Sequence, residues 1–161
     1  MDIFEFAVQK EKFSEDFYRD LAGRTRNKGL RTIFDMLAGE EAHHRQVIER
    51  IKAKIPARLS ETDVLSNAVD VFKRMKEGID KFAFAATDLE AYKKAQDIEQ
   101  QSRDFYLQKA DEVEDNCQKG VFTKLADEEK KHFLLLENII EFVSRPQQWL
   151  ENAEFFHLDE Y

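Results

Sequence analysis

A glutamate and a histidine lie within an apolar helical stripe and are the first residues that suggest chemistry. Glu41 and His44 are three residues apart, so they share one face of a helical turn. The same face carries Phe34, Leu37 and Ile48, and is therefore expected to point into the core. A buried carboxylate is costly unless another charge compensates it. The pair therefore predicts compensating charge from elsewhere in the chain.

An internal repeat supplies the partners. Residues 3–51, aligned without a gap to the residues 88 positions later, are identical at 15 positions. These are Ala7, Glu11, Ser14, Asp16, Phe17, Tyr18, Ala22, Phe34, Leu37, Ala38, Glu40, Glu41, His44, Glu49 and Ile51. The shift places a second Glu-x-x-His pair at Glu129 and His132. It also relates Glu11 to Glu99, and both lie in apolar stripes. The sequence therefore predicts two equivalent sets of buried ionisable residues.

Four buried glutamates and two histidines are best compensated by two metal ions. Mixed carboxylate and imidazole ligation suits iron or manganese, with zinc as a further possibility. The predicted metal ligands are Glu11, Glu41, His44, Glu99, Glu129 and His132. Glu41 and Glu129, each beside a histidine of its own helix, are expected to bridge the two metals. The other two glutamates are expected to be terminal ligands, and each histidine is expected to bind one metal.

Two tyrosines are candidate catalytic residues around these ligands. Tyr18 and Tyr106 follow Glu11 and Glu99 by seven residues, two turns along the same face. Their hydroxyl groups would reach a ligand carboxylate or a bound oxygen species and orient the ligands. The alternative is that both are ordinary core tyrosines.

The repeat also predicts the elements that position these residues. The expected helices are residues 3–24, 30–54, 88–114 and 121–143, with a turn at about 115–120. Two antiparallel hairpins joined by one long crossover, at about 56–87, form an all-α, ferritin-like four-helix bundle. We expect the bundle to occupy residues 1–145. The aromatic tail, 146–161, is expected to pack on the bundle or on a neighbouring subunit.

Composition excludes several classes of function. The 161 residues include 14 Phe but only five Gly and two Pro, which favours helices. A net charge of −8 without a basic stripe argues against nucleic acid as a partner. No apolar run is long enough to span a membrane, and the start does not resemble a signal peptide. A single cysteine allows no disulfide within the chain. We expect a soluble cytoplasmic protein without a membrane partner.

The doubled motifs resemble those of rubrerythrins in the ferritin-like superfamily. The matching residues are Glu-x6-Tyr at Glu11–Tyr18 and Glu99–Tyr106, and Leu-Ala-x-x-Glu-x-x-His at Leu37–His44 and Leu125–His132. The resemblance covers roughly residues 3–143. It implies a non-haem protein with two iron ions, commonly a homodimer or a larger assembly, and in rubrerythrins proper a reductase of hydrogen peroxide.

Two departures refine this expectation. One cysteine cannot form the two Cys-x-x-Cys knuckles of a rubredoxin domain, so the electrons are expected from a separate donor protein, either rubredoxin-like or of another kind. Rubrerythrins proper also carry an extra glutamate near the ligand on the third helix. The residues one turn either side of Glu99 are not acidic (Ala95, Gln96, Ser102 and Arg103), which favours a symmetric site of six ligands.

The expected function is a di-iron oxidoreductase that reduces hydrogen peroxide or reacts with oxygen. One alternative is a ferroxidase or iron-handling protein. Another is a non-catalytic metal-binding module whose metals only neutralise the core and whose aromatic tail, with Trp149 and Phe155, binds a partner.

Overall fold

The protein is a bundle of long antiparallel helices. A computed structural model describes residues 2–77 and 86–145, and these contain five helices and no strand. The helices are α1 (Ile3–Arg24), α2 (Lys28–Lys52), α3 (Val64–Glu77), α4 (Ala86–Glu112) and α5 (Asn116–Ser144). The predicted all-α, ferritin-like architecture is confirmed.

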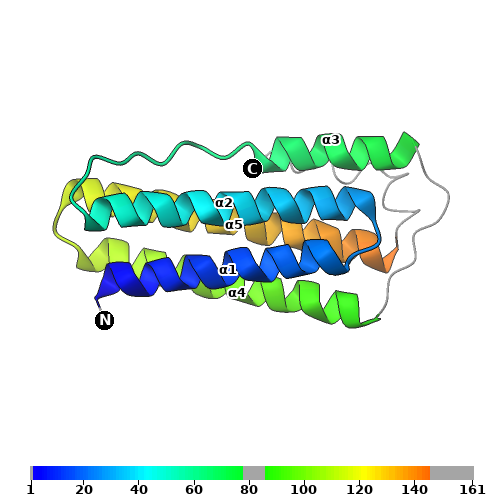
Figure 1. Ribbon diagram of the computed structural model, residues 1–161, viewed down its shortest axis with the longest axis horizontal. Helices are drawn as coiled ribbons and strands as arrows, with labels where there is room; N and C mark the ends of the chain where they lie inside the picture. Colours follow the sequence, from blue (N-terminus) through cyan, green and yellow to red (C-terminus); the bar gives the residue numbers. More distant parts are fainter. Residues whose placement is uncertain (1, 78–85, 146–161) are drawn as a thin grey trace.

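Two hairpins form the bundle (Figure 1). The helices α1 and α2 pack along their length, as do α4 and α5, and α1 lies beside α4 while α2 lies beside α5. Each short turn ends with a capping side chain. Asn27 accepts a hydrogen bond from the Leu30 backbone N–H at 2.9 Å, and Asp115 accepts one from the Gln118 backbone N–H at 2.9 Å. These caps satisfy N–H groups that have no partner within their own helix.

The second cap corrects one predicted boundary. The turn was expected at about 115–120, with the last helix beginning near residue 121. The helix begins at Asn116 because Asp115 is its N-cap. Gly120 lies inside the helix on the exposed surface, where a side chain would meet no neighbour. A glycine in a helix costs less than about 1 kcal/mol relative to alanine, which a 29-residue helix tolerates.

The crossover contains an extended segment and then α3. Residues 55–63 run along the bundle beside α2, and α3 continues in the same direction (Figure 1). The apolar face of α3 is buried against α2 and α5 through residues such as Leu65, Ala68 and Phe72. Phe72 meets Phe142 of α5 edge to face, with ring centroids 5.6 Å apart. The last part of the predicted crossover, 78–85, and the aromatic tail, 146–161, lie outside the described residues.

The core consists of two apolar clusters. One includes Phe34, Phe72 and Phe142, towards the end of the bundle where α3 packs. The other includes Val47 and Phe122, towards the opposite end. Along each of the four bundle helices, the residues between these clusters are the ones that carry the buried glutamates and histidines. No described helix has an apolar stretch long enough to cross a membrane.

Candidate metal centre

A layer of ionisable side chains divides the apolar core. It consists of the six predicted ligands, Glu11 of α1, Glu41 and His44 of α2, Glu99 of α4, and Glu129 and His132 of α5. All six are at most 2 % exposed. The structure therefore brings together every residue that the repeat predicted for the site. Their binding of metal stays a prediction.

The local sequence explains why these side chains point inward. On α2, Phe34, Leu37 and Ile48 are fully buried on the face that carries Glu41 and His44. Burying this apolar face, at roughly 1.5–3 kcal/mol per large apolar side chain, carries the polar pair into the core. The equivalent face of α5, which includes Phe122, acts in the same way.

The six residues form two overlapping groups. In each group, one ligand atom from every member lies within 4.8 Å of the others. The first group is Glu11, Glu41, His44 and Glu129, and the second is Glu41, Glu99, Glu129 and His132. Glu41 and Glu129 therefore belong to both groups, whereas each of the other four residues belongs to one.

Each histidine contacts a glutamate of the other hairpin. His44 Nδ1 lies 3.1 Å from Glu129 Oε1, and His132 Nδ1 lies 3.0 Å from Glu41 Oε1. The two rings are nearly parallel, with centroids 5.7 Å apart and planes 8° apart. Each imidazole thus directs Nδ1 at the glutamates and leaves Nε2 on the outer side.

A further glutamate faces each outer nitrogen, and the sequence analysis did not select either one. Glu128 Oε1 lies 3.4 Å from His44 Nε2, and Glu40 Oε1 lies 3.7 Å from His132 Nε2. A carboxylate on the far nitrogen of a metal-binding histidine fixes the ring and increases its basicity. The signal was present, because Glu40 and Glu128 are equivalent in the 88-residue repeat.

The tyrosines contact the glutamate of the opposite hairpin. The Tyr18 hydroxyl donates to Glu99, and the Tyr106 hydroxyl donates to Glu11. Burial, together with the neighbouring carboxylates, raises the pKa of both phenols well above the ordinary value. Both therefore remain protonated donors. The sequence placed each tyrosine near a ligand but could not show that the hydrogen bond crosses to the other helix pair.

The carboxyl groups divide into two kinds in the metal-free protein. Burial, and then the charges of Glu11 and Glu99, raise the pKa of Glu41 well above its ordinary value. Burial and the Glu41 and Glu99 carboxyls do the same to the pKa of Glu129. Burial also opposes ionisation of Glu99, but the charge of His132 and hydrogen bonds from Glu129 and Tyr18 leave its pKa at about 2.

The remaining three groups complete the balance of charge. Burial opposes ionisation of Glu11, but a hydrogen bond from Glu41 and the charge of His44 lower its pKa. Burial alone would lower the pKa of His44, but Glu11 and other carboxylates raise it well above the ordinary value. The pKa of His132 is raised in the same way against the effect of burial, mainly by the charge of Glu99. In the metal-free core these shifts favour the charged imidazoles beside ionised Glu11 and Glu99, and favour the protonated forms of Glu41 and Glu129.

This donor set fits metal ions. Glu11 Oε2 and Glu99 Oε2 are buried without a hydrogen-bond partner, which is unusual for carboxylate oxygens in a core. Four carboxylates and two imidazoles in two overlapping groups match the mixed oxygen and nitrogen ligation of first-row transition metals. Such ions would take the places of the protons on Glu41, Glu129 and the two Nδ1 atoms.

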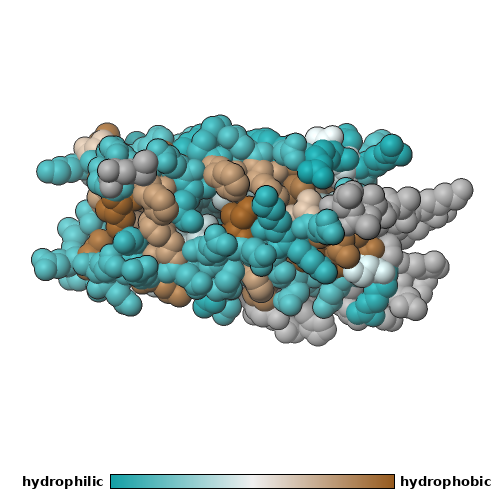
Figure 2. Space-filling view, turned by 90° about the horizontal axis from the view of Figure 1, so that it is seen from below, coloured by the Kyte–Doolittle hydropathy of each residue, from teal (hydrophilic) through white to brown (hydrophobic). Residues whose placement is uncertain are grey.

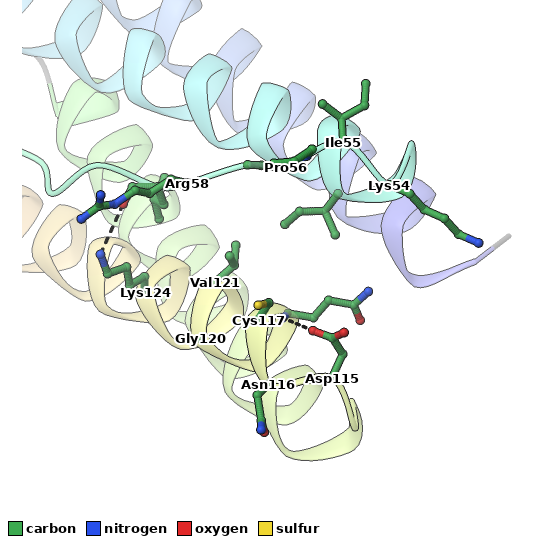
Figure 3. Close-up of a pocket in the computed structure, with 14 residues that line it drawn as sticks. Lys54, Ile55, Pro56, Arg58, Asp115, Asn116, Cys117, Gly120, Val121 and Lys124 are labelled. Atoms are coloured by element: carbon green, nitrogen blue, oxygen red, sulfur yellow. Dashed lines mark hydrogen bonds between the residues drawn. The ribbon is translucent and has the colours of Figure 1, made fainter.

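A larger pocket at the end of the bundle does not belong to this site. It has a volume of about 780 Å³ and lies between residues 54–59 and the start of α5 (Figure 3). Its Lys54, Arg58 and Lys124 side chains are exposed, as is Cys117, and Lys124 donates to the Leu59 carbonyl at 3.4 Å. Ile51, the pocket residue of α2, is ten positions beyond Glu41, or roughly 15 Å along the helix.

The comparisons with known proteins agree with this geometry. The family model for rubrerythrin matches residues 2–140. The searches of curated proteins and of solved structures gave no match. The matched range covers most of the chain and contains all six residues of the cluster, both tyrosines and both outer glutamates. The chain therefore belongs to the rubrerythrin family.

Proposed function

We propose that this protein is a di-iron oxidoreductase that reduces hydrogen peroxide. The observation that carries the proposal is the pair of overlapping donor groups, because two shared glutamates between two sets of terminal donors suit two neighbouring metal ions. When bound, a pair of iron ions can exchange two electrons with peroxide or oxygen. Membership of the rubrerythrin family supports iron over manganese or zinc.

The roles of the residues follow from their positions in the two groups. Glu41 and Glu129, which belong to both groups, would be the residues shared between two bound metal ions. Glu11 and His44 complete one position, and Glu99 and His132 complete the other. The apolar clusters on both sides keep bulk water from the site, which strengthens the electrostatic interactions within it.

Proton supply and electron supply have different sources. The phenol groups of Tyr18 and Tyr106 donate hydrogen bonds to Glu99 and Glu11, so each holds a proton beside the site. We propose that electrons come from a donor outside the bundle, because the single cysteine of these 161 residues cannot form a rubredoxin centre. We further propose a homodimer as the working assembly.

Metal analysis and rapid kinetics test the proposal. Purified protein should contain about two iron ions per chain, as expected for a two-metal site. The reduced protein, mixed with hydrogen peroxide or with oxygen in a stopped-flow spectrometer, should be oxidised faster by peroxide. A faster reaction with oxygen would indicate a ferroxidase instead. Full metal content with no response to either oxidant would support a non-catalytic metal-binding module.

A further inference from the structure

A small pocket opens between α1 and α4, close to the buried glutamates. Its volume is about 220 Å³, and its lining residues are Phe6, Gln9, Lys10, Phe13, Ser14, Ile98, Gln101 and Ser102. Figure 2 shows the face of the molecule on which α1 and α4 lie, with apolar side chains among hydrophilic ones. Phe6 and Phe13 are 45 % and 57 % exposed, so the rim of the pocket is aromatic and reaches solvent.

Two of the residues that line this pocket are serines. Ser14 and Ser102 are equivalent in the 88-residue repeat, and each is only 4 % exposed. Neither hydroxyl forms a hydrogen bond within the described part of the chain. Both hydroxyls therefore keep their capacity to donate and accept hydrogen bonds for a polar molecule that enters the pocket.

The serines lie one helical turn from the glutamates of α1 and α4. Ser14 follows Glu11 by three residues, and Ser102 follows Glu99 by three residues. Side chains at this spacing are neighbours, with about 5–6 Å between their Cβ atoms. The pocket lining includes pairs of residues that are equivalent in the 88-residue repeat, namely Lys10 with Ile98, Phe13 with Gln101 and Ser14 with Ser102, so both hairpins contribute equally placed residues to it.

The rim indicates the charge and the size of the ligand. The Lys10 ammonium lies 5.6 Å from the ring centre of Phe6 and 5.5 Å from that of Phe105. This positive charge beside an aromatic surface disfavours metal cations. The volume is about seven times the roughly 30 Å³ that one water molecule occupies in the liquid, so the pocket suits a small ligand.

We propose that the α1–α4 pocket is the binding and entry site for a small uncharged oxidant, which the Ser14 and Ser102 hydroxyls hold by hydrogen bonds. Hydrogen peroxide has the required chemistry, because each of its hydroxyl groups can both donate and accept. The proposal rests on the proposed function and adds to it the route by which the oxidant reaches the metal pair.

Nitric oxide is a suitable probe of entry because it is small and uncharged and binds reduced iron without turnover. The valine pair, Ser14→Val with Ser102→Val, removes both hydroxyls and narrows the pocket with two methyl groups at each position. Stopped-flow spectra of the reduced, iron-loaded protein should show nitric oxide binding at least about tenfold more slowly, because the added methyl groups obstruct its entry. A tenfold decrease in rate corresponds to an added barrier of about 1.4 kcal/mol. Iron content and the rate of iron extraction by a chelator should not change.

Two further variants separate entry from general damage. In Ser144→Val, a serine at the end of α5 is replaced, and nitric oxide binding should stay at the wild-type rate. The alanine pair, Ser14→Ala with Ser102→Ala, leaves the pocket open, so nitric oxide should enter at least as fast as in wild type. The KM for peroxide should rise about tenfold, as expected for a lost hydrogen bond.

Wild-type rates of nitric oxide binding in the valine pair would overturn the proposal, as would an unchanged KM in the alanine pair. If the valine pair fails to retain iron, the alanine pair alone decides. If wild-type protein binds iron but does not reduce peroxide, the proposed function fails, and slow nitric oxide binding in the valine pair would still establish the entry route.

Discussion

Protons and metal ions would compete for the same atoms in the buried cluster. In the metal-free protein, the raised pKa values of two carboxyl groups and both imidazoles favour their protonated forms, because an uncompensated negative charge is costly in a core that excludes water. Each of these protons must leave before its atom can bind metal. The affinity of the site for metal is therefore linked to pH through residues that are themselves ligands.

Metal affinity should rise with pH. The pKa values of Glu41, Glu129, His44 and His132 are all raised, so lowering the pH favours the protonated, metal-free form. Between about pH 8 and pH 6 the apparent affinity should fall, with protons released on binding. Calorimetric titrations with a divalent metal, in buffers of different ionisation enthalpy, measure the number released. Affinity that is constant over this range, with no proton release, would contradict the assignment of protons.

Two alanine variants distinguish a bridging from a terminal ligand. Glu41 belongs to both donor groups, so Glu41→Ala should lose metal from both positions. Glu11 belongs to one group, so Glu11→Ala should mainly weaken one position and leave about one ion per chain, given the two-metal site. Metal analysis after gel filtration measures both. Equal, small losses in the two variants would refute the bridging role.

Removing the Tyr18 hydroxyl should affect the metal position on the opposite hairpin. Tyr18→Phe leaves the Glu99 carboxylate without its phenol donor, and loss of such an outer partner typically weakens metal binding by about 10–100-fold. Competition with a chelator should show one weakened and one unchanged position. Tyr106→Phe, which acts on Glu11, is the symmetric comparison. Two unchanged affinities in either variant would identify the tyrosine as a core residue only.

At the scale of elements, helical periodicity and the repeat were sufficient to predict the hairpins and the six clustered residues. Periodicity could not place the start of α5, because Asp115 and Gly120 are both typical of turns and only the capping hydrogen bond shows which one ends the turn. It also missed Glu40 and Glu128. Which histidine nitrogen a carboxylate reaches depends on how the hairpins cross, and that is a tertiary property.

The helix α3 stabilises the end of the bundle through a few large side chains. Phe72 is fully buried against Phe142, so Phe72→Ala should cost about 3–5 kcal/mol of unfolding free energy through lost burial and a residual cavity. Urea denaturation measures this change. Phe13→Ala, at a side chain 57 % exposed, is the control and should change stability by less than about 0.5 kcal/mol. Similar effects of both substitutions would show that α3 does not pack as described.

For the whole molecule, the donor layer links metal binding to folding. The two apolar clusters lie on either side of this layer, so unfolding of the bundle also disrupts the site. Because the six donors come from four helices, the unfolded chain cannot present them together. Metal would therefore bind the folded state preferentially, and its binding would add directly to stability.

Metal removal should lower the thermal stability of the protein. At a free metal concentration of 100 times the dissociation constant, one site adds about 2.7 kcal/mol. For a chain of this size, each 1 kcal/mol shifts the melting temperature by about 2–4 °C, so loading should raise it by at least about 5 °C. Calorimetric scans of metal-free and iron-loaded protein measure the shift. Glu41→Ala should respond little to added metal, because its shared ligand is missing. A wild-type melting temperature that does not depend on metal would mean that the buried cluster does not use metal ions to compensate its charge.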